Sequence, residues 1–172
     1  FTDGFFSELK NVVDKYDPKT IYFRDEHFFH DKKRIPQLIE FYKKNNFNFK
    51  WRATIRAGDV RERYVNQDLL KELEEINCEC LKFGIESGSQ TMLDIMEKKF
   101  VVNDIKKAIF SCNEIGLASP LQGFMVGMPG ETLKTAKASG RLLGELAAKL
   151  RVPLKLIYNN FKPDQQKVIR RN

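Results

Sequence analysis

The sequence predicts an α/β fold with a parallel sheet, and three observations lead to this class. Short apolar, β-rich runs alternate with longer segments whose apolar residues recur at helical spacing. The helical segments have the ordinary length of crossovers between parallel strands. Polar or glycine-rich residues follow four of the predicted strands directly, where parallel α/β folds place their chemistry. Strand spacing alone leaves open whether the sheet is doubly wound or closed toward a barrel.

The first part of the chain alternates helix and strand twice. Apolar residues recur at helical spacing in two segments, and the second tolerates Pro36 because this proline falls in its first turn. A short β-rich run follows each segment. We therefore expect helices over 5–16 and 35–42, and strands over 21–23 and 49–56.

The rest of the chain continues the same alternation. Asn66 or Gln67 opens a helix, Ser89 can cap a short one, and Gly116 is a good signal for the end of a longer one. We expect helices over 66–76, 89–96, 103–115 and 131–150, and strands over 80–85, 121–126 and 153–158.

Composition and charge indicate an ordinary soluble domain. Of 172 residues, 42% are hydrophobic and 31% charged, which suits one domain with a real core. We expect no transmembrane helix, because no run of about 18 apolar residues occurs, and no signal peptide is visible. The net charge of +7 fits solvated helix faces best. Attraction to an anionic substrate or cofactor and nucleic-acid binding are weaker alternatives, and no recognised motif supports the last.

The cysteines and histidines do not predict a metal site. The sequence has three cysteines, Cys78, Cys80 and Cys112, of which the first two form one close pair. An odd number of cysteines gives no disulfide framework and suggests a reducing, cytoplasmic setting. Two neighbouring thiols alone do not make a zinc or cluster site. His27 and His30 are interpreted as loop residues. We therefore predict structural thiols and no metal ligands in this chain.

The polar residues after the strands predict a ligand site. Because the carboxyl ends of parallel strands meet at one edge of the sheet, these residues should share a rim. Acidic groups there can accept hydrogen bonds from an ammonium or from ribose hydroxyls, an arginine can hold a carboxylate, and glycine lets the backbone approach a flat ring. S-adenosylmethionine offers all of these features, and a nucleotide or amino acid would suit much of the same set. The segments are 24–27, 52–56, 86–90 and 127–132.

Each of these residues also has a purely structural interpretation. Asp25 and Glu26 would serve equally as caps for the following helix, and Arg56 as a surface residue. The segment 129–132 would serve as a turn that starts a helix. Glu86 follows a wholly apolar strand and precedes Ser-Gly-Ser, so the structural interpretation is weakest for this residue.

Four segments together resemble the core of the radical S-adenosylmethionine superfamily. Residues 83–90, Phe-Gly-Ile-Glu-Ser-Gly-Ser-Gln, are similar to its fourth-strand segment. Residues 124–132, Phe-Met-Val-Gly-Met-Pro-Gly-Glu-Thr, are similar to its fifth. Residues 21–29 and 51–56 resemble its second and third strands, the second as in the cobalamin-binding branch. Order and spacing agree along nearly the whole chain, and four motifs in register are strong evidence where one would be moderate.

The resemblance implies a partial TIM-like (β/α) barrel of about five parallel strands with outer helices. These correspond to strands 2–6 of a six-stranded open barrel, over residues 1–163, with 164–172 as a tail. S-adenosylmethionine would bind across the rim and be cleaved reductively to a 5′-deoxyadenosyl radical in the parent protein. The resemblance assigns no catalytic residue. The cofactor-binding residues that it implies are Asp25, Glu26, Arg56, Glu86, Ser87, Met125, Gly127 and Pro129.

One family feature is absent from this sequence. The family holds a 4Fe–4S cluster with Cys-x-x-x-Cys-x-x-Cys, and the three cysteines here do not have that spacing. The chain also lacks an initiator Met, so we expect a fragment of a parent that carries the cluster and is compatible with cobalamin. The fragment alone should not cleave S-adenosylmethionine.

Two alternatives to this reading stay open. One is a cluster-free barrel that acts as a ligand-binding or interaction module, and the other is an RNA-modifying relative. We expect a small-molecule substrate in the cytoplasm, no membrane partner, and an exposed sheet edge that would permit dimer formation. The substrate itself cannot be read from these residues.

Overall fold

A computed structural model describes residues 3–25, 27–60, 64–119 and 121–150 and contains one four-stranded sheet. The strands are β1 (Thr20–Tyr22), β2 (Lys50–Ile55), β3 (Cys78–Glu86) and β4 (Leu121–Phe124). They pair in the order β1-β2-β3-β4, and every pair is parallel. The expected fifth strand over 153–158 and the expected tail lie outside the described residues.

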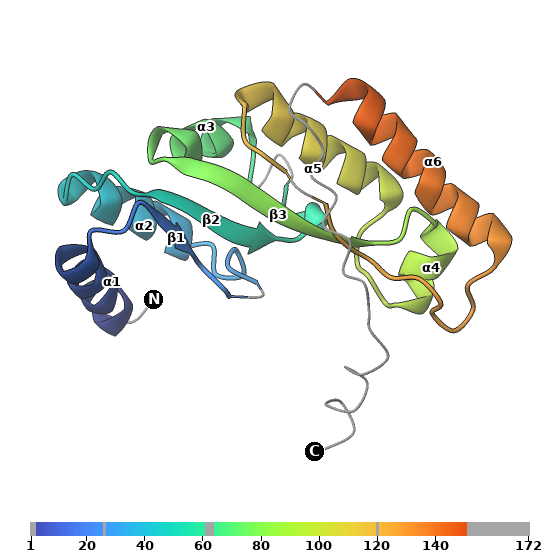
Figure 1. Ribbon diagram of the computed structural model, residues 1–172, viewed down its shortest axis with the longest axis horizontal. Helices are drawn as coiled ribbons and strands as arrows, with labels where there is room; N and C mark the ends of the chain where they lie inside the picture. Colours follow the sequence, from blue (N-terminus) through green and yellow to red (C-terminus); the bar gives the residue numbers. More distant parts are fainter. Residues whose placement is uncertain (1–2, 26, 61–63, 120, 151–172) are drawn as a thin grey trace, which may run out of the picture.

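The sheet curls into part of a barrel, with helices along its outer side (Figure 1). Strand spacing left open whether the sheet is doubly wound or closed toward a barrel, and the curl shows that it is a partial barrel. The helices are α1 (Asp3–Tyr16), α2 (Arg34–Lys44), α3 (Gln67–Glu75), α4 (Gln90–Ile95), α5 (Val102–Ile115) and α6 (Leu133–Lys149), with a 3₁₀ turn, η1 (Ala57–Asp59).

The two faces of the sheet differ sharply in polarity. Alternate residues of β2 and β3 are fully buried and form one apolar cluster with residues of α2, α3 and α5. Trp51 sits in this cluster and donates an indole hydrogen bond to the Ile76 carbonyl at 2.8 Å. Side chains alternate across a strand, so the intervening residues face the inner side of the curl. The inner-face residues used below are Tyr22, Arg52, Thr54, Lys82, Gly84 and Glu86.

Local signals set most helix ends where the sequence predicts them. Asn66 accepts a hydrogen bond from the Leu69 amide at 2.9 Å, so α3 begins as expected. Gly116 ends α5 with φ 93°, a conformation that favours glycine. Thr132 caps α6, which therefore begins at Leu133, two residues later than expected. Ser89 is the N-cap residue of α4, as expected, but its side chain makes no capping hydrogen bond.

Within the described part of the chain, every helix is too short or too polar to cross a bilayer.

Candidate functional site

The predicted rim is formed by the segments that follow the four parallel strands. These segments leave the same edge of the sheet, because all the strands point the same way. Glu86 is the last residue of β3, and its carbonyl accepts a hydrogen bond from the Met125 amide at 2.9 Å. The structure thus places the third predicted segment beside Met125, which leads into the fourth.

Glu86 has an unusual backbone conformation. Its φ is 63°, in the left-handed region that side chains larger than glycine seldom adopt. The Ser87 amide bonds back to the Ile85 carbonyl at 2.7 Å, which closes a γ-turn around Glu86. Strained backbone of this kind is concentrated at functional sites, because the surrounding structure must hold it in place. The strain singles out Glu86 among the predicted site residues.

The Glu86 carboxylate lies in a shallow cradle on the inner face. Lys98, which follows α4, donates a hydrogen bond to its Oε1 atom at 3.1 Å. A Cβ atom on Gly84 would lie 3.2 Å from the same oxygen, and one on Gly123 would lie 3.5 Å from Oε2. The Glu86 side chain is 18% exposed. The two glycines therefore leave room beside a carboxylate that still reaches solvent.

Ser87 and Gly88 fasten the segment after β3 to α6. The Ser87 hydroxyl accepts a hydrogen bond from the Ser89 amide at 3.1 Å and lies 3.2 Å from the Ser139 hydroxyl. The Gly88 amide donates to Ser139 at 2.9 Å. Ser87 is buried, so its hydroxyl is engaged internally rather than directed at the rim. Nothing in the sequence signalled Ser139, because residues 88 and 139 are brought together only by packing.

Asp25 follows β1 and carries an ion pair of its own. Its Oδ2 atom accepts a hydrogen bond from Arg34 at 2.7 Å. The neighbouring His27 Nε2 lies 2.9 Å from the Asp59 Oδ2 atom, which joins the segment after β1 to the segment after β2. Sequence spacing gave His27 no partner. Glu26, the other acidic residue expected here, lies outside the described residues.

Arg56 stands at the end of β2 and just before η1. Its side chain is exposed and forms no ion pair with any described residue. A free guanidinium at a strand end is able to bind a carboxylate from solvent through two parallel hydrogen bonds.

The segment after β4 presents apolar and backbone groups at the rim. Met125 is 40% exposed. Gly127 has φ 81°, and its amide donates to the Glu131 carboxylate. Pro129 is exposed, and the neighbouring Gly130 lies so close to Ile95 of α4 that a Cβ would come within 2.9 Å of its Cδ1 atom. An exposed apolar edge at a glycine-containing turn suits a flat ring.

The cysteines do not fit an iron–sulfur cluster. Cys78, Cys80 and Cys112 are free and buried. Burial raises the pKa of the Cys80 thiol to about 11, that of Cys112 to about 12, and that of Cys78 well above its usual range. Across the residues that the structure covers, no group of three or more His, Cys, Asp or Glu side chains is placed to hold a metal.

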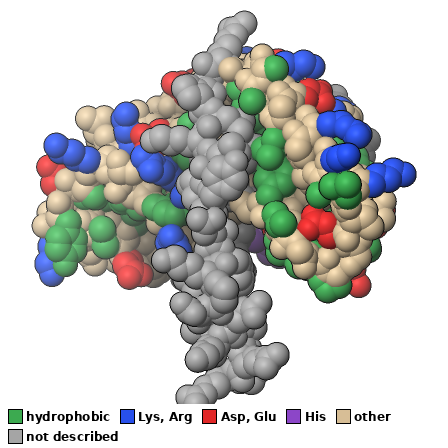
Figure 2. All heavy atoms as spheres, turned by 45° about the vertical axis from the view of Figure 1, so that its right-hand side comes forward, with side chains coloured by type: hydrophobic (Ala, Val, Ile, Leu, Met, Phe, Trp, Pro, Cys, Tyr) green, Lys and Arg blue, Asp and Glu red, His purple; other side chains and the backbone are tan. Residues whose placement is uncertain are grey.

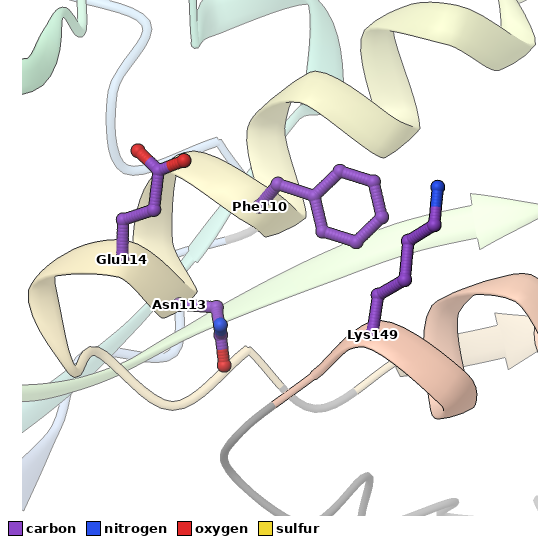
Figure 3. A pocket seen from close by; sticks show the side chains of 4 residues that line it. All are labelled: Phe110, Asn113, Glu114 and Lys149. Atoms are coloured by element: carbon purple, nitrogen blue, oxygen red, sulfur yellow. The ribbon is translucent and has the colours of Figure 1, made fainter.

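A pocket of about 350 Å³ lies away from this rim, between α5 and α6. Figure 3 shows its lining side chains, with Lys149 of α6 facing Phe110 of α5. The Lys149 ammonium is 5.6 Å from the Phe110 ring centre. Because the pocket is at the carboxyl ends of two helices that run against the strands, it sits at the opposite edge of the sheet from Glu86. It is therefore separate from the candidate site.

Charge is dispersed over the surface seen in Figure 2. Lys and Arg side chains occur on both sides of this face and are interleaved with Asp and Glu. On this face, the net positive charge is spread among solvated side chains rather than gathered into one basic patch.

Comparison with known proteins identifies the family. The sequence profile of the radical SAM superfamily matches residues 7–143. A Pyrococcus horikoshii protein described as an uncharacterized methyltransferase is 28% identical over 132 residues, which cover 77% of this chain and 28% of that protein. The present chain therefore spans little more than a quarter of this relative.

Two solved structures share the fold. OxsB, a cobalamin-dependent S-adenosylmethionine radical enzyme, was solved with aqua-cobalamin and S-adenosylmethionine bound. It superposes with a TM-score of 0.73 at 16% identity, over 96% of this chain and 25% of OxsB. The Escherichia coli coproporphyrinogen III oxidase HemN, a radical SAM enzyme, gives a TM-score of 0.58 at 14% identity, over 74% of this chain and 29% of HemN. With a partial parallel barrel, a strained glutamate at its rim and a profile match over most of its length, the chain belongs to the radical SAM superfamily.

Proposed function

We propose that this chain is the part of a radical SAM enzyme that binds S-adenosylmethionine at the carboxyl ends of its strands. The observation that carries the proposal is the Glu86 carboxylate, held at a strained strand end between Gly84 and Gly123 and still open to solvent. A strained acidic group with space beside it suits the recognition of ribose hydroxyls.

The other rim residues complement the rest of the ligand. Arg56, which has no ion-pair partner among the residues described, would hold the methionine carboxylate. Asp25 would accept from the methionine ammonium, with Arg34 fixing the orientation of its carboxylate. Met125, Gly127 and Pro129 would pack against the adenine. Glu26 and Ser87 would complete the site, Ser87 through its backbone because its hydroxyl is engaged internally.

The chain's own part in the reaction is to bind and orient this donor. When bound, S-adenosylmethionine supplies a sulfonium whose reductive cleavage yields the adenosyl radical, and that chemistry belongs to the cofactor rather than to protein side chains. The described residues do not fit a 4Fe–4S cluster, since the three thiols are buried and no group of three or more His, Cys, Asp or Glu among these residues is placed to hold a metal. We infer that the isolated chain binds the donor without cleaving it, and that the whole protein holds a cluster through other cysteines and uses cobalamin as OxsB does.

Calorimetric titration of the chain with S-adenosylmethionine tests the binding proposal. We expect saturable binding by the unaltered chain and a Kd raised about tenfold or more in Glu86→Gln, because the amide replaces a charge-assisted acceptor. Glu79→Gln is the matched control, since Glu79 lies at the other end of the same strand. Equal Kd values in the two variants, or no saturable binding by the unaltered chain, would contradict the proposal.

Reconstitution tests the inference about cleavage. The chain is incubated with iron, sulfide, a strong reductant and S-adenosylmethionine, and 5′-deoxyadenosine is measured by chromatography. We expect none above a protein-free control. Production of 5′-deoxyadenosine by this chain alone would overturn the inference.

We infer a small-molecule substrate and a cytoplasmic setting for the whole protein. The three free, buried thiols favour a reducing compartment. The outer edge of β1 has no strand partner among the described residues, so association of two copies along this edge is a further proposal. Light scattering that shows a monomer at high concentration would count against association.

A further inference from the structure

Three side chains on the inner face of the sheet gather around the Tyr22 ring. The Lys82 ammonium lies 3.9 Å from the centre of the Tyr22 ring, and the Arg24 guanidinium carbon lies 5.1 Å from it. Both distances are within the range of cation–π attraction. Thr54 lies opposite Lys82 in the sheet register. We call Tyr22, Arg24, Thr54 and Lys82 the Tyr22 cluster.

Strand pairing places this cluster on the inner face. Lys82 lies between Leu81 and Phe83, which are fully buried against the helices, so Lys82 points to the other side of β3. Thr54 likewise lies between the fully buried Ala53 and Ile55 of β2. The cluster therefore belongs to the polar face, which the apolar core does not use.

The two cations of the cluster have no acidic partner among the described residues. Within the described part of the chain, neither Arg24 nor Lys82 forms an ion pair with a carboxylate. Arg52, on the same face, differs because it pairs with Glu79. Glu86 pairs with Lys98 rather than with Lys82. Among the described residues, two positive charges thus converge on one site without a carboxylate to compensate them, at an energetic cost that an anionic ligand would relieve.

The electrostatics of Tyr22 agree with this geometry. Burial raises the pKa of the Tyr22 phenol, but hydrogen bonds with Thr54 and Lys82 and the charges of Lys82 and Arg24 outweigh burial, so that the pKa lies below its ordinary value. The surroundings of Tyr22 therefore stabilise negative charge.

We propose that the Tyr22 cluster is the subsite for an anionic group of the substrate, a carboxylate or a phosphate. The proposal rests on the proposed function, because it assigns the inner face beneath the donor site to the substrate. Arg24 and Lys82 supply the positive charge, and the hydrogen-bonded pair of Tyr22 and Thr54 hydroxyls supplies one further hydrogen-bond donor.

The distance along β3 sets the size of such a substrate. Lys82 and Glu86 are four residues apart on one strand, roughly 13 Å at about 3.3 Å per residue. A substrate anchored at Lys82 would have to span much of this distance to bring its reacting carbon near the donor. The substrate that fits this spacing is an elongated small molecule with a terminal anionic group.

Titration of the ¹⁵N-labelled chain with inorganic phosphate and, separately, with acetate at constant ionic strength tests the proposal by NMR. We expect saturable shifts of the Tyr22, Thr54 and Lys82 amides. The Kd for the tighter anion should rise about tenfold in Lys82→Met, which keeps most of the side-chain stem and removes the charge. The Kd of Lys82→Arg for the same anion should stay within about threefold of that of the unaltered chain. This result would show that the loss of charge, rather than misfolding, weakens binding in Lys82→Met. Tighter binding of phosphate or of acetate identifies the anionic group.

Two controls separate this proposal from the donor site. Lys71→Met removes an exposed charge paired with Asp68 and should leave anion binding unchanged. Glu86→Gln should weaken the binding of S-adenosylmethionine and leave phosphate binding unchanged. Lys82→Met should weaken phosphate binding and leave the binding of S-adenosylmethionine unchanged. Absence of saturable anion binding, or equal Kd values in Lys82→Met and Lys71→Met, overturns the Tyr22 cluster as a subsite, whatever the outcome for the donor.

Discussion

The Lys98 ammonium donates a hydrogen bond to the Glu86 carboxylate at 3.1 Å, across the segment that carries α4. Lys98 is 33% and Glu86 18% exposed, so the pair closes one side of the cradle without sealing it. The ion pair orients the carboxylate of Glu86, whose backbone is strained. It thereby helps to hold a backbone conformation that is unfavourable for glutamate.

Replacement of Glu86 by glycine should separate strain from ligand binding. Glycine adopts positive φ at little cost, so Glu86→Gly relieves about 1 kcal/mol of strain while it loses a partly exposed ion pair worth less than about 1 kcal/mol. We expect the free energy of unfolding in urea to stay equal or rise slightly. Glu79→Gly, in the same strand but with ordinary φ, should lower it by about 1 kcal/mol. Equal losses in both variants would contradict strain at Glu86.

A methyl group at Gly88 should loosen α6 from the rim. A Cβ there would lie 2.6 Å from the Ser139 Cα and 2.8 Å from the Ala138 carbonyl oxygen, both backbone atoms that cannot turn aside. We expect Gly88→Ala to lower the free energy of unfolding by about 1–3 kcal/mol. Gly140→Ala, in open space within α6, should instead raise it by about 0.5–1 kcal/mol. Urea unfolding followed by circular dichroism measures the free energy of unfolding of both variants. An unchanged free energy in Gly88→Ala would refute the close contact.

The three thiols should resist alkylation in the folded chain. Burial raises the pKa of Cys78, Cys80 and Cys112, and only the thiolate reacts. With iodoacetamide at about pH 8, mass spectrometry should detect no modification of the native chain and three modified sites after unfolding in urea. Rapid native labelling of any of them would mean that its surroundings are more open than the structure shows.

Stability should fall in strongly alkaline solution, in part through Tyr64. Burial and the charges of Asp59 and Asp31 raise the pKa of this phenol from 10.0 to about 12. The folded chain therefore keeps a proton that the unfolded chain releases, so stability present below pH 10 is lost as pH rises toward 12. Urea midpoints over this range should decline less steeply in Tyr64→Phe. Tyr16→Phe, at a ring 64% exposed, should leave the slope unchanged. Parallel slopes for Tyr64→Phe and the unaltered chain would count against this assignment.

Much of the fold was predictable because its signals are local. Helical spacing predicted α1, α2, α3, α5 and α6 to within about two residues at most ends, and Gly116 and Asn66 mark ends that the structure confirms. The four loops after the strands were also predictable, since parallel strands present them at one edge. Ser89 was predicted correctly as the residue before α4, but the capping hydrogen bond that its residue type favours is not made.

By itself, then, the sequence determined the alternation of strands and helices, the position of Glu86 at a strand end and the family, because these depend on neighbouring residues and short motifs. Only the tertiary structure decided that Lys98 donates a hydrogen bond to Glu86 and that the Gly88 amide donates one to Ser139. It also decided that Lys82 and Arg24 both lie near the Tyr22 ring. Most of these partners are distant in sequence, and the curl of the sheet and the packing of α6 set their distances. No spacing pattern encodes such contacts, which arise when the apolar core closes and leaves the opposite face of the strands to polar side chains.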